Sequence, residues 1–169
     1  MNPALEAFNR AGSNAALLSL MSCCGSHRWA HTVATLRPFK DEEALFVAAD
    51  DIWTQMSESD LMEAFRAHPR IGERKPAQAS AQSKKWSSQE QAAVHDSETE
   101  ILAELAASNH RYEELFGFTY IVCATGKSAK EMLAILKVRL ANDRQSELQE
   151  AAEQQRQITQ IRLRKWLQV

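Results

Sequence analysis

Residues that interrupt helices are scarce in this sequence, with five glycines and four prolines among 169 residues. Strong helix formers such as Ala, Leu, Glu, Gln and Lys are abundant by contrast, which favours helix over most of the chain. The shortage of glycine also argues against a dinucleotide site or a phosphate-binding loop, and there is no G-x-S-x-G nucleophile motif. The composition therefore predicts an all-α protein and excludes several common classes of enzyme.

Cysteine is also scarce, and its three copies do not form a recognisable site. Cys23 and Cys24 are adjacent, so they are poorly placed to bridge each other, and Cys123 is far away in the sequence. No pair has the C-x-x-C spacing of a zinc site or a redox pair. We therefore expect reduced thiols in a cytoplasmic protein.

The chain lacks both long apolar runs and an excess of one charge. Its apolar runs are shorter than a membrane-spanning helix requires, and the N-terminal residues do not have the pattern of a signal peptide. The 20 basic and 22 acidic residues give a net charge of -2, which offers no basic surface for nucleic acid. The sequence therefore predicts no membrane partner and no nucleic-acid partner.

Helix start and stop signals indicate a multi-helix bundle, which we expect to form a single domain over residues 1–169. A polar stretch over residues 70–86 is predicted to be a loop, of the length that often serves a function. Residues 118–124 have the composition of a β-strand but are too isolated to build a sheet, so we expect a buried extended or irregular segment near 118–125. The predicted helices cover residues 2–10, 15–21, 26–36, 41–56, 57–68, 87–109 with a further turn or two to 116, 128–140 and 144–166.

The sequence His68-Pro69-Arg70-Ile71-Gly72 follows directly on one predicted helix. Proline cannot continue a helix, and it forces the preceding residue out of the α region. His68 should therefore lie at a helix end, where an imidazole that titrates near neutral pH can meet a ligand. The alternative is a simple helix stop that carries a surface histidine.

Other polar residues admit two interpretations each. Ser87 and Glu90 have the spacing of a capping box, which explains them structurally, although a helix start beside a polar loop can also bind an anionic or carbonyl-rich ligand. Arg139 and Arg162 border apolar residues, so they either extend to solvent or pair inward with a carboxylate, and the surface position is the safer expectation. His27 and His31 lie one helical turn apart but lack a third ligand nearby, so we expect no metal site.

Several short motifs in a fixed order give the chain a family resemblance. These are His68-Pro69-Arg70-Ile71-Gly72, Ser87-x-x-Glu90-Gln91, the stretch from Gly117 to Ala124, and Arg139-Leu140-x-Asn142. Cys24-Gly25-Ser26 followed by Trp29, Arg37-Pro38-Phe39, and Ile158-x-x-x-Arg162-Leu163 fit the same pattern. Together they resemble 2-oxo-4-hydroxy-4-carboxy-5-ureidoimidazoline (OHCU) decarboxylase, an enzyme of urate degradation, over nearly the whole chain.

The resemblance implies an all-helical, cofactor-free carboxy-lyase, usually a homodimer, that converts OHCU to (S)-allantoin and CO₂. It assigns the catalytic positions to His68, Glu90 and Arg162. Arg139 also matches a family position, but we rank it as structural. The chain lacks the peroxisomal tripeptide of many eukaryotic members, which fits a bacterial cytoplasmic member. The substrate contacts that it implies are Pro69, Ser87, Ser88, Gln89, Glu90, Gln91, Tyr120, Ile121, Val122, Cys123 and Ala124.

The implied chemistry needs no cofactor, because a ring carbonyl next to the reacting carbon can accept the electrons as an enolate. His68 then acts either as the acid that reprotonates this carbon or as a base on the hydroxyl group, and the sequence does not choose between these roles. Two other hypotheses remain open. One is a non-enzymatic helical protein that binds a partner through its Gln-rich last helix. The other is a related enzyme for another ureido or imidazoline compound.

Overall fold

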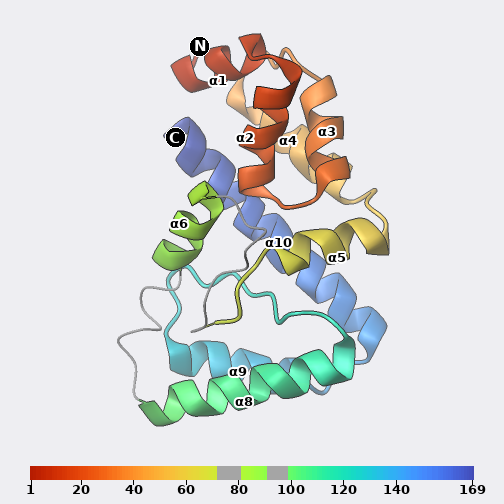
Figure 1. Ribbon diagram of the computed structural model, residues 1–169, viewed down its shortest axis with the longest axis vertical. Coiled ribbons are helices and arrows are strands. Elements are labelled where there is room, and N and C mark those ends of the chain that lie inside the picture. Colours follow the sequence, from red (N-terminus) through yellow and green to blue (C-terminus); the bar gives the residue numbers. More distant parts are fainter. Residues whose placement is uncertain (72–80, 91–98) are drawn as a thin grey trace. The chain divides into compact units, whose positions relative to one another are not determined.

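The computed structural model describes residues 1–71, 81–90 and 99–169, apart from the side chains of Ala81 and Ser88. Every regular element in these ranges is an α-helix (Figure 1), which confirms the predicted class. The helices are α1 (Pro3–Arg10), α2 (Ser13–Cys23), α3 (His27–Thr35), α4 (Glu42–Trp53), α5 (Glu58–Arg66), α6 (Ala81–Glu90), α8 (Thr99–Phe116), α9 (Ala129–Arg139) and α10 (Arg144–Leu167).

Most helices begin where the sequence predicts, because a side-chain oxygen accepts the first free backbone N–H groups. Asn2 caps α1, with Pro3 at the first helical position, and Ser26 and Asp41 cap α3 and α4. Ser128 and Glu131 form a capping box at the predicted start of α9. Helix α2 begins two residues before its predicted start at residue 15. This helix begins at Ser13, after a glycine that provides no side-chain hydrogen bond.

The chain divides into two compact units. Unit 1 contains Met1–Ala64 and Arg156–Val169, and unit 2 contains Phe65–Gln155. In unit 1, helices α2 and α4 both pack on α3. The indole of Trp29 on α3 is fully buried and donates a 2.9 Å hydrogen bond to the Ala49 carbonyl of α4. Phe8 of α1 packs edge-on against Trp166 near the end of α10, with 5.0 Å between ring centroids.

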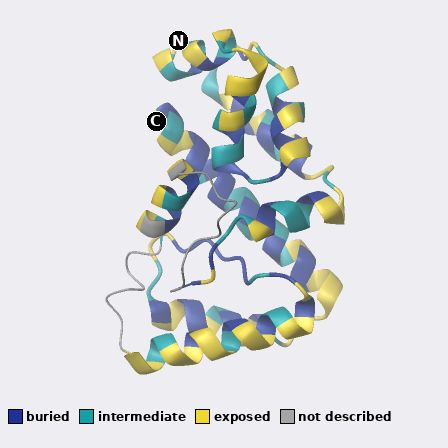
Figure 2. Ribbon diagram, viewed as in Figure 1, coloured by how far each residue is buried: buried dark blue, intermediate teal, exposed yellow. Residues whose placement is uncertain are grey.

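Unit 2 is built on the packing of α8 against α9. The rings of Tyr112, Phe116, Phe118 and Tyr120 form an aromatic cluster, with centroid separations between 4.7 and 6.2 Å among its contacting pairs. Gly117 ends α8 with a φ of +81°, which turns the chain into residues 118–124. These residues form no regular element and are buried except for Thr119 (Figure 2), so the predicted buried segment, extended or irregular, is confirmed; we call it the extended segment.

One predicted element is wrong. The sequence predicted a loop to Trp86 and a helix that begins at Ser87, but α6 runs from Ala81 to Glu90. Ser87 and Glu90 therefore lie in the last turn of a helix and cannot form an N-terminal capping box. Side chains spaced three and four residues apart share a helix face, and Ser83, Trp86 and Ser87 are all buried. Burial of this face explains why the polar stretch is helical.

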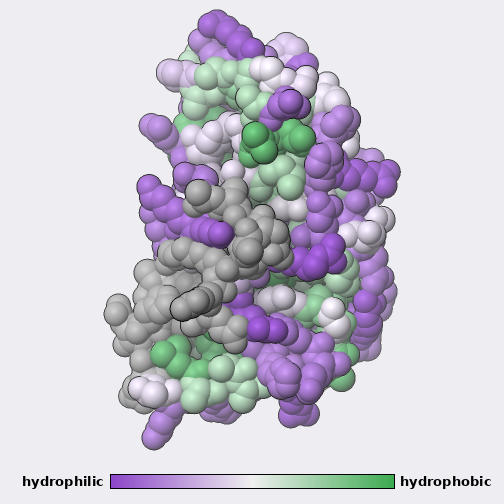
Figure 3. Space-filling model, in the orientation of Figure 1, coloured by the Kyte–Doolittle hydropathy of each residue, from purple (hydrophilic) through white to green (hydrophobic). Residues whose placement is uncertain are grey.

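On the face shown in Figure 3, most of the described surface is hydrophilic, and apolar residues appear in separate areas. Among the residues that the structure describes, no helix combines the length and apolar character needed to cross a membrane.

Candidate functional site

His68 occupies the helix break that the sequence predicts. Helix α5 ends at Arg66, and the His68 N–H closes a final turn by donating to the Phe65 carbonyl at 3.1 Å. Pro69 and Ile71 are buried on either side of the exposed Arg70, and His68 itself is half-buried. The guanidinium of Arg70 donates two hydrogen bonds to Glu113 of α8, at 2.6 and 2.7 Å. The segment after α5 is thus held at several points, which fixes where the imidazole lies.

The imidazole contacts a residue that the sequence did not single out. His68 Nε2 lies 2.6 Å from Oε1 of Gln155, which projects from α10 and is fully buried. Ala151, Gln155, Ile158 and Thr159 recur at helical spacing and are all buried, so Gln155 lies on the buried face of α10. The glutamine was hidden among the many polar residues of this helix.

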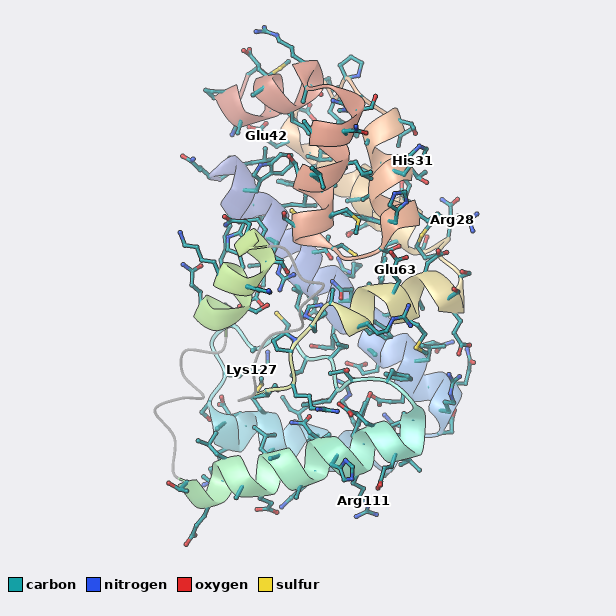
Figure 4. The ribbon with its side chains drawn as sticks, in the orientation of Figure 1. Arg28, His31, Glu42, Glu63, Arg111 and Lys127 are labelled. Atoms are coloured by element: carbon teal, nitrogen blue, oxygen red, sulfur yellow. The ribbon has the colours of Figure 1, made fainter. Side chains whose placement is uncertain are left out.

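The extended segment forms no helix or strand, so side chains provide hydrogen-bond partners for its backbone groups. Buried backbone groups need such partners, since an unpaired one is costly. Gln154 Oε1 accepts the Cys123 N–H at 2.8 Å, and Arg139 donates to the Ile121 carbonyl at 2.6 Å. Lys127 Nζ donates to the Cys123 carbonyl at 2.8 Å, and Figure 4 shows Lys127 beside this segment. The segment is therefore fixed from α9, from α10 and from the turn that follows it.

Arg139 pairs inward with a buried carboxylate, so the surface position expected from its local sequence is wrong. It is 4% exposed and donates to the fully buried Glu147, which also accepts the hydroxyl of Tyr112 and, at 3.0 Å, the amide of Asn142. Burial raises the pKa of Tyr112. Burial is the largest single effect and lowers the pKa of Arg139, but the hydrogen bonds to Glu147 together with the charges of Glu147, Tyr112 and Tyr120 leave that pKa raised.

Glu90 acts electrostatically on the extended segment. Burial raises the pKa of the Cys123 thiol, the nearby Lys127 lowers it, and the Glu90 carboxylate raises it. Glu90 and Lys127 therefore both lie within electrostatic reach of Cys123. Sequence reasoning missed Lys127, which lies three residues after the β-like stretch 118–124, with no motif around it.

The other predicted substrate contacts differ in burial. Pro69, Ser87 and all of Tyr120–Ala124 are buried, whereas Gln89 is exposed on α6. The side chain of Ser88 and the whole of Gln91 lie outside the described residues. Of the backbone N–H groups expected to meet substrate, that of Cys123 is already bound to Gln154.

Arg162 lies in unit 1, on the part of α10 beyond Arg156. It is 2% exposed, so the surface position expected from its local sequence is wrong. Its charge opposes the effect of burial on two neighbouring thiols. Burial raises the pKa of Cys24 to about 11 and raises that of Cys23 further, while Arg162 lowers both. Convergence of Arg162 with His68 and Glu90, both in unit 2, stays a prediction.

His27 and His31 remain ordinary surface residues of α3. Their rings stack with centroids 6.4 Å apart, and both are exposed. The nearby Glu63 carboxylate is engaged, because it accepts the backbone N–H of His27 at 3.1 Å; Figure 4 shows His31 and Glu63. Within residues 1–71, 81–90 and 99–169, no three His, Cys, Asp or Glu side chains gather as metal ligands would.

These features define an all-helical protein with a histidine at a helix break, a buried glutamine bonded to that histidine, and a rigid aperiodic segment within reach of Glu90. Comparison with known proteins identifies the family. The OHCU decarboxylase model matches residues 9–164, and the chain belongs to that family.

Individual relatives agree with this membership. The chain is 38% identical over 144 residues to the uric acid degradation bifunctional protein TTL of Arabidopsis thaliana, covering 85% of this chain and 44% of that protein. It is 26% identical over 132 residues to the OHCU decarboxylase of Amia calva, covering 78% of this chain and 75% of that one. A crystal structure of OHCU decarboxylase in the presence of (S)-allantoin matches with a TM-score of 0.78 at 32% identity, over 94% of this chain and 100% of the other. The chain thus spans less than half the length of its bifunctional Arabidopsis relative.

Proposed function

We propose that this protein decarboxylates OHCU to (S)-allantoin and CO₂ in the degradation of urate, without a cofactor. The observation that carries the proposal is the family match over residues 9–164. The arrangement in unit 2 supports it, because a histidine held at a helix break is suited to proton transfer. The internal contacts of Gln154 and Gln155 also speak against the rival scaffold, in which the Gln-rich helix would face a partner.

The reaction places three requirements on the protein. It must orient the leaving carboxylate, stabilise the enolate that forms as CO₂ departs, and deliver one proton to one face of the ring. The electron pair of the broken carbon–carbon bond passes to the neighbouring ureido-bearing ring carbon and its C=N bond, not to a ring carbonyl. The product forms when that ureido-bearing carbon takes up a proton and the hydroxyl-bearing carbon becomes a ring carbonyl. A donor on one face accounts for a single enantiomer.

The proposed catalytic roles follow from charge and burial. His68 moves the proton, and Glu90 accepts hydrogen bonds from the ureido and ring N–H groups. Arg162 is a buried cation that can hold a carboxylate in a bidentate fork. The backbone N–H groups of residues 120–124, other than that of Cys123, bind carbonyl or oxyanion oxygens in a site rigid enough to need little reorganisation.

We also propose that the protein is a cytoplasmic homodimer. Three buried free cysteines suit a reducing compartment, and the family resemblance supports the dimer. Sedimentation velocity of the purified protein tests the dimer, and a single species at the monomer mass of 19.0 kDa would contradict it.

The decisive experiment replaces His68 with asparagine. His68→Asn keeps a polar side chain of similar reach but cannot exchange a proton near neutral pH, so turnover of freshly generated OHCU should fall by at least ~100-fold. Circular dichroism at wavelengths where allantoin absorbs follows both the rate and the handedness of the product. Spontaneous decay gives racemic allantoin, so the variant's product should lose its optical activity.

His31→Asn is the matched control, because His31 is exposed on α3 and belongs to no proposed site. Equal turnover by wild type and His68→Asn would overturn the catalytic role. Profiling other ureido-imidazoline compounds separates OHCU from the related substrates of the rival enzymatic hypothesis. Faster turnover of one of them would reassign the substrate.

A further inference from the structure

The buried amide of Gln155 is the feature that the proposed chemistry does not yet use. A side-chain amide buried in a protein is stable only when its polar atoms are hydrogen-bonded. Gln155 has no solvent exposure, and its Oε1 lies 2.6 Å from Nε2 of His68. A carbonyl oxygen can only accept a hydrogen bond, so the proton in this contact belongs to His68 Nε2.

We propose that Gln155 is a positioning residue that holds His68 in its Nε2–H form, so that proton exchange with the substrate occurs at Nδ1. This inference rests on the proposed decarboxylation. Which ring nitrogen of a histidine carries the proton is set by the hydrogen bond that the other nitrogen makes. With Nε2–H donating to Gln155, the lone pair of the neutral ring is at Nδ1.

Both proposed roles of His68 are compatible with this arrangement, and the protons balance in each. As an acid, the imidazolium gives its Nδ1 proton to the ureido-bearing carbon beside the one that has lost CO₂, and the enol electron pair forms the new C–H bond. The hydroxyl proton passes through water to the ring nitrogen, leaving a carbonyl, and neutral His68 regains a proton from water. As a base, Nδ1 takes the hydroxyl proton first and later returns it to the ureido-bearing carbon, while water protonates the ring nitrogen. The Nε2–H bond to Gln155 is kept throughout.

The position of Gln155 on α10 makes it an effective support. Successive residues of a helix point about 100° apart, so Gln154 and Gln155 reach different segments of unit 2. Gln154 Oε1 accepts the Cys123 N–H at 2.8 Å, and Gln155 Oε1 lies 2.6 Å from Nε2 of His68. One turn of a single helix therefore sets the imidazole and the extended segment together, which is the precise support that a catalytic geometry requires.

The charged groups of unit 2 near this region have identified partners or neighbours. Arg70 is paired with Glu113, and Glu150 accepts the Gln154 amide at 2.9 Å. Glu90 and Lys127 act on Cys123. The neutral Gln155 amide contacts the imidazole without adding charge, so it can fix the tautomer while leaving the ring able to gain or lose a proton.

The test compares Gln155→Met, which has a similar shape but no carbonyl, with Gln155→Glu, which keeps an acceptor and adds a charge. We expect Gln155→Met to lower kcat by ~10-fold or more while KM changes by less than about 3-fold, because orientation is lost while substrate contacts remain. Gln155→Glu should retain more activity and move the acidic limb of the pH–rate profile to higher pH, since a carboxylate stabilises the imidazolium. Gln149→Met, at an exposed position of α10, is the matched control.

Nitrogen-15 NMR of histidine-labelled protein reads the tautomer directly, and His68→Asn identifies the His68 signals. Wild type above the His68 titration should show a protonated Nε2 and an unprotonated Nδ1, and Gln155→Met should show a mixture. An unchanged tautomer in Gln155→Met, or an unshifted pH profile in Gln155→Glu, would overturn the positioning role, even if activity fell. If wild type does not decarboxylate OHCU, the proposed function fails, while the NMR comparison still decides whether Gln155 sets the tautomer.

Discussion

Glu147 shows how a single residue can organise the candidate site without touching substrate. Its fully buried carboxylate accepts hydrogen bonds from Tyr112, Arg139 and Asn142, and Arg139 in turn holds the Ile121 carbonyl. A buried ion pair contributes little compared with an apolar replacement of both partners, but removal of one partner leaves a buried charge uncompensated. The network therefore stabilises the extended segment only while it is complete.

Replacement of Glu147 by glutamine should lower the free energy of unfolding by about 3 kcal/mol, because Arg139 keeps its buried charge and loses its counter-ion. Urea denaturation followed by circular dichroism measures this change. Glu104→Gln is the matched control. It breaks an ion pair between Glu104 of α8 and Lys137, which lies on α9 like Arg139, and both side chains of this pair are about half exposed. That exposed pair should contribute less than ~1 kcal/mol. Equal losses in the two variants would contradict the network.

At the scale of single residues, the sequence alone does not distinguish buried residues that support the site from residues on the surface. Arg139 and Arg162 both border apolar neighbours, and nothing in that pattern shows that both are buried. Gln155 carries no motif, and its importance depends on contact with a residue 87 positions away. His68 was predictable because proline marks its place in the chain. Residues identified by a backbone effect can be found from sequence, whereas those identified by a distant partner cannot.

Among the elements, α5 matters because it leads directly to His68. Its first turn carries a reciprocal cap, in which the Ser57 N–H and hydroxyl donate to Asp60 at 3.0 and 2.7 Å and the Asp60 N–H donates to the Ser57 hydroxyl. The hydrogen bond from the Ser57 hydroxyl is the main reason that the pKa of Asp60 is lowered, and Arg28 adds to the effect. The cap is therefore sensitive to pH.

This lowered pKa sets the direction of a stability change with pH. The pKa of Asp60 is lower in the folded protein than the ordinary value of about 3.9, so its stabilisation is complete above that value and is lost as the pH falls through the folded pKa. Thermal unfolding between pH 7 and pH 2 should show Asp60→Asn less stable than wild type at neutral pH, with the difference shrinking below about pH 4. A difference that stays constant to pH 2 would count against the cap.

The junction between α8 and the extended segment depends on the backbone of Gly117. Its φ of +81° is one that side chains with a Cβ rarely adopt, although there is open space where that atom would lie. Gly117→Ala should therefore cost about 1–2 kcal/mol from backbone strain alone. Gly117→Asn should cost less, because asparagine tolerates this conformation better. The urea midpoints of the two variants give the comparison, and equal losses would point to a steric cause.

Element boundaries were predictable wherever a local cap decides them, as in α1, α3, α4 and α9. The prediction failed for α6, where Ser87 and Glu90 have the spacing of a cap but lie at the other end of a helix. A capping box is a local pattern that any serine and glutamate can match by chance. Burial of Ser83, Trp86 and Ser87 on one face is a tertiary effect that overrides it.

In the molecule as a whole, the two units are joined within helices. The chain passes between them at Ala64–Phe65 inside α5 and at Gln155–Arg156 inside α10. Domain boundaries ordinarily fall in exposed, flexible linkers where few contacts cross. A helix cannot lose one half without exposing the hydrogen-bonding groups of the other, so we expect the units to unfold together as one domain, as predicted from the length of the chain.

The buried cysteines provide a test of this coupling, because Cys23 and Cys24 lie in unit 1 and Cys123 lies in unit 2. All three should react with a thiol reagent only after unfolding, since burial excludes the reagent and raises their pKa values. The Cys123→Ala variant reports on unit 1, and the double variant Cys23→Ala, Cys24→Ala reports on unit 2. If the units unfold together, each variant's thiols should become reactive at the same urea concentration at which its helical circular dichroism is lost. Reaction in one unit before the helical signal falls would show that the units open separately, and that α10 does not couple His68 to Arg162.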